Sequence, residues 1–176
     1  MAEKHRRATL IHNDKAGDRR HSRAGLIELL QRAGFRIEYF SAKECDVAEV
    51  VGHPADLLVV AGGDGTVAKV VAVAKPEGPP IAILPLGTAN NIARSHGIEG
   101  RPDDIVASWE ARKTRPFYPI SVSGPWGTCR LSEGIGFGAF ERAMSEVPRK
   151  SGLTRARQAM RRAVLDAPPE CLEISI

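Results

Sequence analysis

The sequence predicts an α/β protein with a doubly wound, mostly parallel sheet, followed by the start of a second, β-rich region. Short apolar runs alternate with segments of helical periodicity through the first two thirds of the chain. One run, DLLVVA, is apolar after its first residue, Asp56, which is typical of a strand covered on both faces. After Arg115-Pro116 this alternation stops. We therefore predict one domain over residues 1–115 and an incomplete second domain over residues 116–176.

Strand and helix signals follow one another along the first domain. The expected strands are short and apolar, and they cover residues 8–13, 35–40, 56–61 and 81–84. The expected helices cover residues 22–33, 46–53, 66–75, 90–96 and 102–111. Asp46 and Glu49 have capping-box spacing, Gly34 and Gly97 suit helix ends, and Pro102 suits a first helical turn.

The second region begins with a hairpin signal. Residues 117–123 and 128–132 flank the turn Gly124–Gly127. Residues 153–165 form an amphipathic, arginine-bearing pattern that predicts a helix, and residues 172–176 predict a strand that has only begun.

Composition narrows the function classes. With 43% apolar and 26% charged residues among 176, the chain is of globular type, and its apolar runs are too short to span a bilayer. Its three cysteines form no CxxC pair, which fits a reduced, cytoplasmic setting with buried, inert thiols. The net charge of +4 favours an anionic partner such as a nucleotide, a phosphate, a membrane or nucleic acid. Nucleic acid is disfavoured, because aromatic residues make up only 5% and no recognition motif is present.

The strongest motif is Gly62-Gly63-Asp64-Gly65-Thr66, which follows an apolar strand and opens a helix. Glycines let a phosphate approach the backbone, and the helix N-terminus offers free N–H groups. Asp64 would then serve as a Mg²⁺ ligand or as a base for an attacking hydroxyl. The alternative is a tight strand-to-helix turn in which Asp64 only caps a helix.

Two further loops have compatible chemistry. Leu84–Asn91 is again a glycine turn after a strand, where Thr88, Asn90 and Asn91 would contact a phosphate or simply cap the next helix. Asn13–Gly17 ends the first strand, and its Lys15 is either a phosphate partner or an exposed turn lysine. In a doubly wound sheet all three loops meet at one edge. The P-loop pattern GxxxxGK[ST] is absent, so the chain is not a P-loop NTPase.

The motif GGDGT, followed about twenty residues later by PLGTANN, resembles the catalytic domain of the diacylglycerol kinase family in its bacterial lipid-kinase branch. That family shares a superfamily with sphingosine kinases and NAD kinases. The resemblance covers essentially the whole chain. Asn13–Gly17 is similar to the family's first nucleotide loop, and Ser41 falls where the family has a threonine. Thr128–Phe140 is similar to the opening of its second domain.

The resemblance implies an ATP-dependent lipid kinase that uses Mg²⁺ to transfer the γ-phosphoryl group to a lipid hydroxyl. Asp64 would be the catalytic and metal-binding residue. The implied cofactor-binding set is Asn13, Lys15, Gly17, Ser41, Gly62, Gly63, Asp64, Gly65, Thr66, Val67, Ala68, Gly87, Thr88, Asn90 and Asn91.

The chain departs from the family at several positions. The usual x-Asn-Glu after GGDGT is Val67-Ala68-Lys69, the usual Asn-Asp is Asn90-Asn91, and the first-loop proline is Asp14. The family's later acidic residues would fall beyond Ile176. Two alternatives therefore stay open: a truncated, catalytically impaired homologue that binds nucleotide or lipid in a regulatory role, and an NAD kinase.

The expected partners follow from this resemblance. A lipid is the expected substrate, and a homodimer is left open. The arginines of residues 153–165 would make transient contact with an anionic membrane, or they would form a solvated helix face. The expected location is the cytoplasm, including its peripheral, inner membrane face.

Overall fold

The computed structural model describes residues 6–17, 21–110, 114–124, 127–132 and 158. The chain divides into two compact units, Met1–Glu133 and Gly134–Ile176, and the elements below belong to the first. The strands are β1 (Arg6–His12), β2 (Phe35–Ser41), β3 (Leu57–Gly62), β4 (Ile81–Pro85), β5 (Ile120–Gly124) and β6 (Gly127–Leu131). The helices are α1 (Arg23–Arg32), α2 (Val47–Val51), α3 (Asp64–Val73), α4 (Asn91–Ser95) and α5 (Pro102–Ala107).

The first four strands form one parallel sheet in the order β2-β1-β3-β4, which confirms the predicted doubly wound fold. The chain passes from β1 outward to β2 and then returns across β1 to β3. The winding direction therefore reverses between β1 and β3, and open α/β sheets bind ligands in the crevice at such a switch point.

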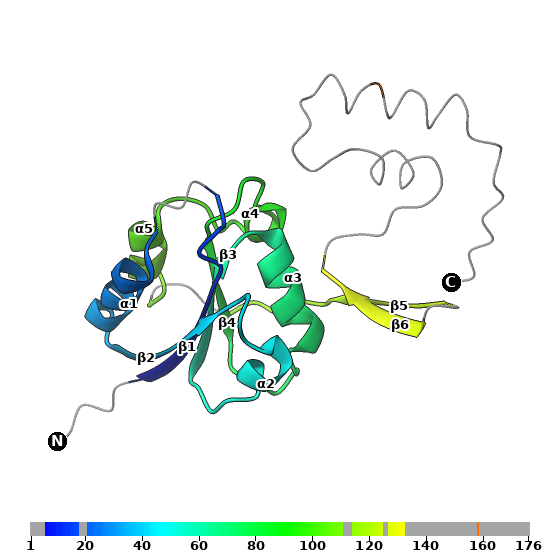
Figure 1. Ribbon diagram of the computed structural model, residues 1–176, viewed down its shortest axis with the longest axis horizontal. Helices are drawn as coiled ribbons and strands as arrows, with labels where there is room; N and C mark the ends of the chain where they lie inside the picture. The colour runs from blue at the N-terminus through cyan, green and yellow to red at the C-terminus, as the bar shows by residue number, and fades with distance from the viewer. Residues whose placement is uncertain (1–5, 18–20, 111–113, 125–126, 133–157, 159–176) are drawn as a thin grey trace. The chain divides into compact units, whose positions relative to one another are not determined.

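Helices cover both faces of this sheet (Figure 1). One core cluster joins the sheet to α1 and α5 through residues such as Leu30 and Ile105. A second cluster joins it to α2, α3 and α4 through Val50, Val70 and Ile92. Because both faces are covered, β3 is buried along almost its whole length, as its continuous apolar run predicts.

Local capping explains most of the helix boundaries. The Gly25 N–H donates to Ser22 Oγ at 3.1 Å and starts α1, and the Ala48 N–H donates to Asp46 Oδ1 at 2.9 Å and starts α2. Helix α5 is shorter than predicted: it ends at Ala107, whereas the sequence predicts a helix as far as residue 111.

Helix α3 begins two residues earlier than predicted. Gly63 is extended, with φ −95° and ψ −175°, and its carbonyl accepts the N–H groups of Thr66 and Val67 at 2.9 and 3.2 Å. Asp64 is therefore the first helical residue, and Asp64-Gly65-Thr66 forms the first turn of the helix rather than a loop before it.

Strands β5 and β6 pair antiparallel, which confirms the predicted hairpin. Arg130 on β6 donates through Nη1 to the carbonyls of Ala72 and Ala74, at 3.4 and 2.9 Å, at the end of α3. Within the helix predicted over 153–165 the structure describes only residue 158, which is helical, and the strand predicted over 172–176 lies outside the described residues. The domain boundary at residue 115 stays a prediction. Among the described helices none is long and apolar enough to cross a membrane.

Candidate functional site

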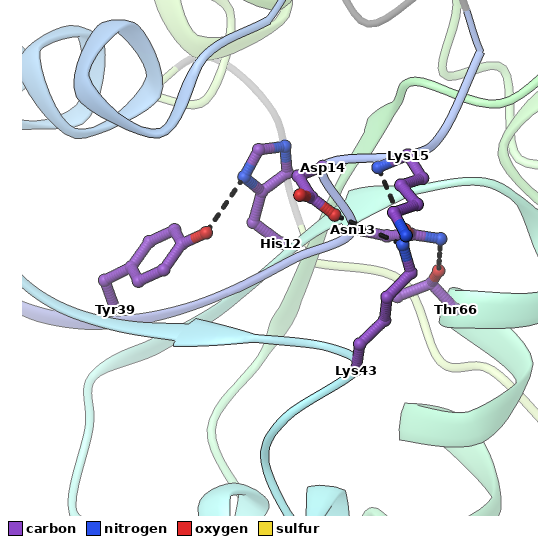
Figure 2. Close-up of polar contacts among 7 residues, drawn as sticks. All are labelled: His12, Asn13, Asp14, Lys15, Tyr39, Lys43 and Thr66. Atoms are coloured by element: carbon purple, nitrogen blue, oxygen red, sulfur yellow. Dashed lines mark hydrogen bonds and ion pairs between the residues drawn. The ribbon is translucent and has the colours of Figure 1, made fainter.

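Three loops meet at the carboxyl edge of the sheet, as the doubly wound fold predicts. They follow β1, β3 and β4. The Asn13 side chain donates to Thr66 Oγ1 at 3.4 Å, which joins the first loop to α3 (Figure 2). The Leu86 N–H donates to the Gly62 carbonyl at 2.9 Å, which joins the third loop to the second. Hydrogen bonds thus connect the three loops that the sequence predicts to meet at this edge.

Glycines make this close approach possible. A Cβ on Gly87 would lie 2.5 Å from the Cα of Gly63, and one on Gly63 would lie 3.1 Å from the Cα of Gly87. Gly17 has a φ of +56°, and a Cβ there would collide with the Leu86 carbonyl oxygen. Packing between the loops therefore accounts for Gly17, Gly63 and Gly87.

Thr66 faces the interior. It is 7% exposed, and a Cβ on Gly62 would lie 2.7 Å from its Oγ1. Its hydroxyl accepts the hydrogen bond from Asn13, so in this structure it connects the first loop to α3. The predicted contact of Thr66 with a phosphate stays a prediction. Val67 is 2% exposed within the core, and Ala68 packs at the margin of the same cluster.

Gly65 has no such structural reason to be glycine. Nothing lies within 4 Å of the position that its Cβ would occupy, and its φ is not left-handed. It lies in the first turn of α3, where helical N–H groups have no partner in a preceding turn. Within the described chain the amides of Asp64 and Gly65 donate to no other group. A bare, outward-facing patch of backbone therefore lies at the start of α3.

Asp64 contacts a different helix from its own. Its Oδ1 accepts the Ile92 N–H at 2.9 Å, which satisfies an unpaired amide in the first turn of α4. The residue is half-buried, and its second carboxylate oxygen has no hydrogen-bond partner among the described residues. One oxygen thus holds α4 against α3, and the other remains available to a ligand.

Asn90 holds the third loop in its conformation. It has a φ of +51°, and its Oδ1 accepts the Gly87 N–H at 2.9 Å while its Nδ2 donates to the Gly87 carbonyl at 2.8 Å. Thr88 and Asn91 are exposed, and in the described part of the chain their side chains form no hydrogen bond. These two residues therefore present polar side chains at the surface of the third loop and the start of α4, whereas the Asn90 side chain is used within the loop.

A polar cluster on β1 and β2 was missed by the sequence analysis. His12 is 1% exposed and places Nδ1 3.3 Å from the Tyr39 hydroxyl (Figure 2). Ser41 lies opposite His12 in the register of β1 and β2. Burial lowers the pKa of His12 and raises that of Tyr39. The Arg23 guanidinium lies 4.2 Å from the centre of the Tyr39 ring. The partners come from three elements, so no local spacing could have indicated the cluster.

Metal binding rests on few carboxylates. No group of three or more His, Cys, Asp or Glu side chains that could hold a metal ion occurs in the described residues. Asp64 remains the carboxylate that the sequence predicts as a metal ligand at this edge of the sheet. Mg²⁺ is commonly held by one or two carboxylates together with phosphate oxygens and water, so one carboxylate beside a phosphate site is compatible with it.

These features define an α/β protein with a doubly wound parallel sheet and three glycine loops at the carboxyl edge of that sheet. A sequence model of the diacylglycerol kinase catalytic domain matches residues 7–122, which is more than half of the chain. The chain belongs to the diacylglycerol kinase catalytic domain family.

Individual relatives agree with this assignment. The chain is 38% identical over 123 residues to a "Probable lipid kinase YegS-like" from Cronobacter sakazakii, covering 65% of this chain and 40% of the relative. It is 31% identical over 113 residues to a diacylglycerol kinase from Staphylococcus aureus, covering 58% and 35%. The chain thus spans 40% or less of these curated relatives. The crystal structure of a diacylglycerol kinase from Bacillus anthracis shares the fold, with a TM-score of 0.52, 24% identity and coverage of 68% of this chain and 44% of that one.

Proposed function

We propose that this chain is an ATP-dependent lipid kinase that transfers the γ-phosphoryl group of ATP to a lipid hydroxyl, and that its described residues form the nucleotide-binding site. The observation that carries this proposal is the bare first turn of α3. Gly65 is open and exposed there, the amides of Asp64 and Gly65 are unpaired in the described chain, and one Asp64 oxygen remains available.

This turn suits a polyphosphate. Its N–H groups and the positive end of the α3 dipole point the same way, and the missing Cβ lets an anion reach the backbone. Lys15, Thr88 and Asn91 are exposed on the two flanking loops and would add donors. The Asn13–Thr66 contact and the Gly63–Gly87 contact keep those loops at a fixed distance from α3. The residues present therefore fit the phosphates of ATP.

Magnesium would be held by the Asp64 oxygen that does not accept the Ile92 N–H. When bound, the ion would neutralise charge on the phosphates as the bond to the leaving group breaks. The reaction forms a bond between the lipid hydroxyl oxygen and the γ-phosphorus, breaks the bond from that phosphorus to the bridging oxygen, and leaves ADP and a proton. Catalysis of this type depends mainly on positioning and electrostatic stabilisation.

A lipid acceptor is supported by the names of the relatives, which are a lipid kinase and diacylglycerol kinases. A lipid acceptor would bring the protein to the surface of a membrane, and the proposed use of ATP favours the cytoplasmic side. The basic segment 153–165 is our candidate for that contact, through attraction between arginine and anionic lipid.

Phosphoryl transfer from labelled ATP tests the proposal. The protein is incubated with Mg²⁺, γ-labelled ATP and a total lipid extract, and labelled lipid is measured against the Asp64→Asn variant. The amide oxygen of that variant can still accept the Ile92 N–H, so the fold is retained while the charge is lost. We expect labelled lipid from the unaltered chain and at least a hundredfold less, about 2.7 kcal/mol, from the variant. Equal labelling by both proteins would contradict the role of Asp64.

A binding role without catalysis is the second candidate. It is favoured because the described residues contain no group of three or more possible metal ligands, and because Ala68-Lys69 replace an amide and a carboxylate. It predicts a clear rise in Tm with MgATP but no labelled lipid. Label on NAD rather than on lipid would instead favour an NAD kinase.

A further inference from the structure

An ion pair between Lys43 and Asp14 lies at the first of the three loops and has no role in the proposed function. Lys43, in the loop after β2, places Nζ 3.3 Å from Oδ1 of Asp14, in the loop after β1. Figure 2 shows this pair next to Lys15 and Asn13. The side chains of Lys43 and Asp14 are 40% and 61% exposed, so water reaches both charges. The ion pair is therefore not required to offset the burial of either charge.

The backbone on both sides of the pair is fixed to the sheet edge. Lys43 follows Ala42, whose N–H donates to the His12 carbonyl at 2.8 Å. Asp14 follows Asn13, whose N–H donates to a carbonyl of β3 at 2.9 Å. The Asn13 side chain also reaches the first turn of α3 through Thr66. Only the side chains of Lys43 and Asp14 must move if a ligand separates them.

The surroundings of Asp14 stabilise negative charge. The hydrogen bond from Lys43 lowers the pKa of Asp14, and the charges of Lys43 and Lys15 lower it further. A polyphosphate carries more negative charge and more acceptor oxygens than a carboxylate, so the same two ammonium groups attract it more strongly. Exposed ion pairs are weak, so a ligand can displace Asp14 easily.

We propose that Lys43 is a phosphate-binding residue of the nucleotide site, and that Asp14 holds it until a polyphosphate takes the place of the carboxylate. The inference rests on the proposed function, and it adds a residue from the β2–α2 loop to the three glycine loops. It also gives Asp14 a role: as an internal competitor it weakens anion binding, and it selects ligands with more phosphate charge over ligands with less.

The two residues therefore have opposite expected effects. Asp14→Asn removes the competing charge, and we expect it to tighten MgATP binding about threefold to tenfold at low salt. Lys43→Ala removes a cation, and we expect it to weaken binding by a similar factor. The loss from Lys43→Ala is expected to be larger when Asp14 is already Asn, because Lys43 is then fully available to the phosphate.

Calorimetric titration of the full chain tests the proposal. The protein, both single variants and the double variant are titrated with MgATP, with magnesium tripolyphosphate and with adenosine, after thermal melting has shown that each is folded. Adenosine carries no phosphate, so its affinity is expected to be the same for all four proteins. Lys75→Ala is the matched control, because Lys75 is an exposed lysine just beyond the opposite end of α3, and it is expected to change nothing.

Each outcome separates this inference from the proposed function. If the protein binds MgATP and Asp14→Asn does not tighten that binding, or Lys43→Ala does not weaken it, the inference is overturned and the proposed function stands. If tripolyphosphate shows the expected pattern and MgATP does not bind, the phosphate role of Lys43 stands and the kinase proposal falls. If neither ligand binds to any of the four proteins, both are overturned.

Discussion

The turns after β3 and β4 both contain glycine and both connect a strand to a helix, but different contacts stabilise their backbone conformations. In the β3–α3 turn Gly63 is extended, α3 starts at once, and Gly65 is left open. In the β4–α4 turn the Asn90 side chain hydrogen-bonds back to both backbone groups of Gly87, in a left-handed conformation. The first turn leaves backbone N–H groups exposed. The second turn supports the first, because Asp64 accepts the Ile92 N–H and Gly63 packs against Gly87.

The largest expected effect comes from Gly87→Ala. The new Cβ would lie 2.5 Å from the Gly63 Cα and 2.8 Å from Asn90 Oδ1, so two backbone segments must move apart. We expect a loss of about 1–3 kcal/mol in the free energy of unfolding, measured by urea denaturation. An unchanged denaturation midpoint would contradict the tight contact between the two turns.

Two substitutions of Asn90 distinguish the contribution of its side-chain hydrogen bonds to stability from that of its left-handed backbone conformation. Asn90→Gly keeps the left-handed φ and loses the side-chain bonds, which we expect to cost about 1 kcal/mol. Asn90→Ala loses the same bonds and also forces alanine into the left-handed region, for about 1 kcal/mol more. Equal midpoints for the two variants would show that the φ of +51° is not maintained in solution.

Gly65→Ala is the matched change in the other turn. Its Cβ meets nothing, and alanine is favoured over glycine inside a helix by up to about 1 kcal/mol, so we expect equal or greater stability. The same methyl group would obstruct a phosphate, and we expect MgATP affinity to fall at least about tenfold. A Gly65→Ala variant that is less stable, or that binds MgATP with unchanged affinity, would contradict the proposal that Gly65 leaves room for a bound phosphate.

The smallest expected effect is a pH dependence that originates away from both turns. Burial lowers the folded-state pKa of His12 below its ordinary value of 6.5, so the folded protein prefers the neutral imidazole. The stability contribution is present above pH 6.5 and is lost as the pH falls through the lowered folded-state pKa. We expect Tm to fall on acidification in that range, and to fall less in His12→Gln. An identical pH profile for the variant would remove His12 as the source.

Much of this arrangement could be predicted from the sequence, because local patterns determine it. Apolar runs gave the four parallel strands, and alternation of strand and helix gave the doubly wound order that brings Asn13, Gly63 and Gly87 to one edge. The glycine motifs also indicated where backbone would be exposed.

The remainder depends on contacts between distant residues. The sequence motif GGDGT did not show that Asp64 begins α3. It also did not show that Asp64 caps α4, because the partner in that hydrogen bond, Ile92, is 28 residues away. The sequence pattern did not show that the Thr66 hydroxyl points inward, because this depends on Asn13 in the loop after β1, 53 residues away. The Asp14–Lys43 pair, 29 residues apart, was equally invisible, although an aspartate in place of the family's proline was a sign of something unusual.

The central claim is that phosphate binds at the bare first turn of α3, and amide NMR tests it most directly. A ¹⁵N-labelled sample is titrated with MgATP and the backbone N–H shifts are followed. We predict that the largest changes occur at Asp64 and Gly65, with smaller ones at Lys15 and Thr88, and none in the hairpin turn at Gly127. Changes that leave Asp64 and Gly65 unaffected while MgATP binds elsewhere would contradict the account.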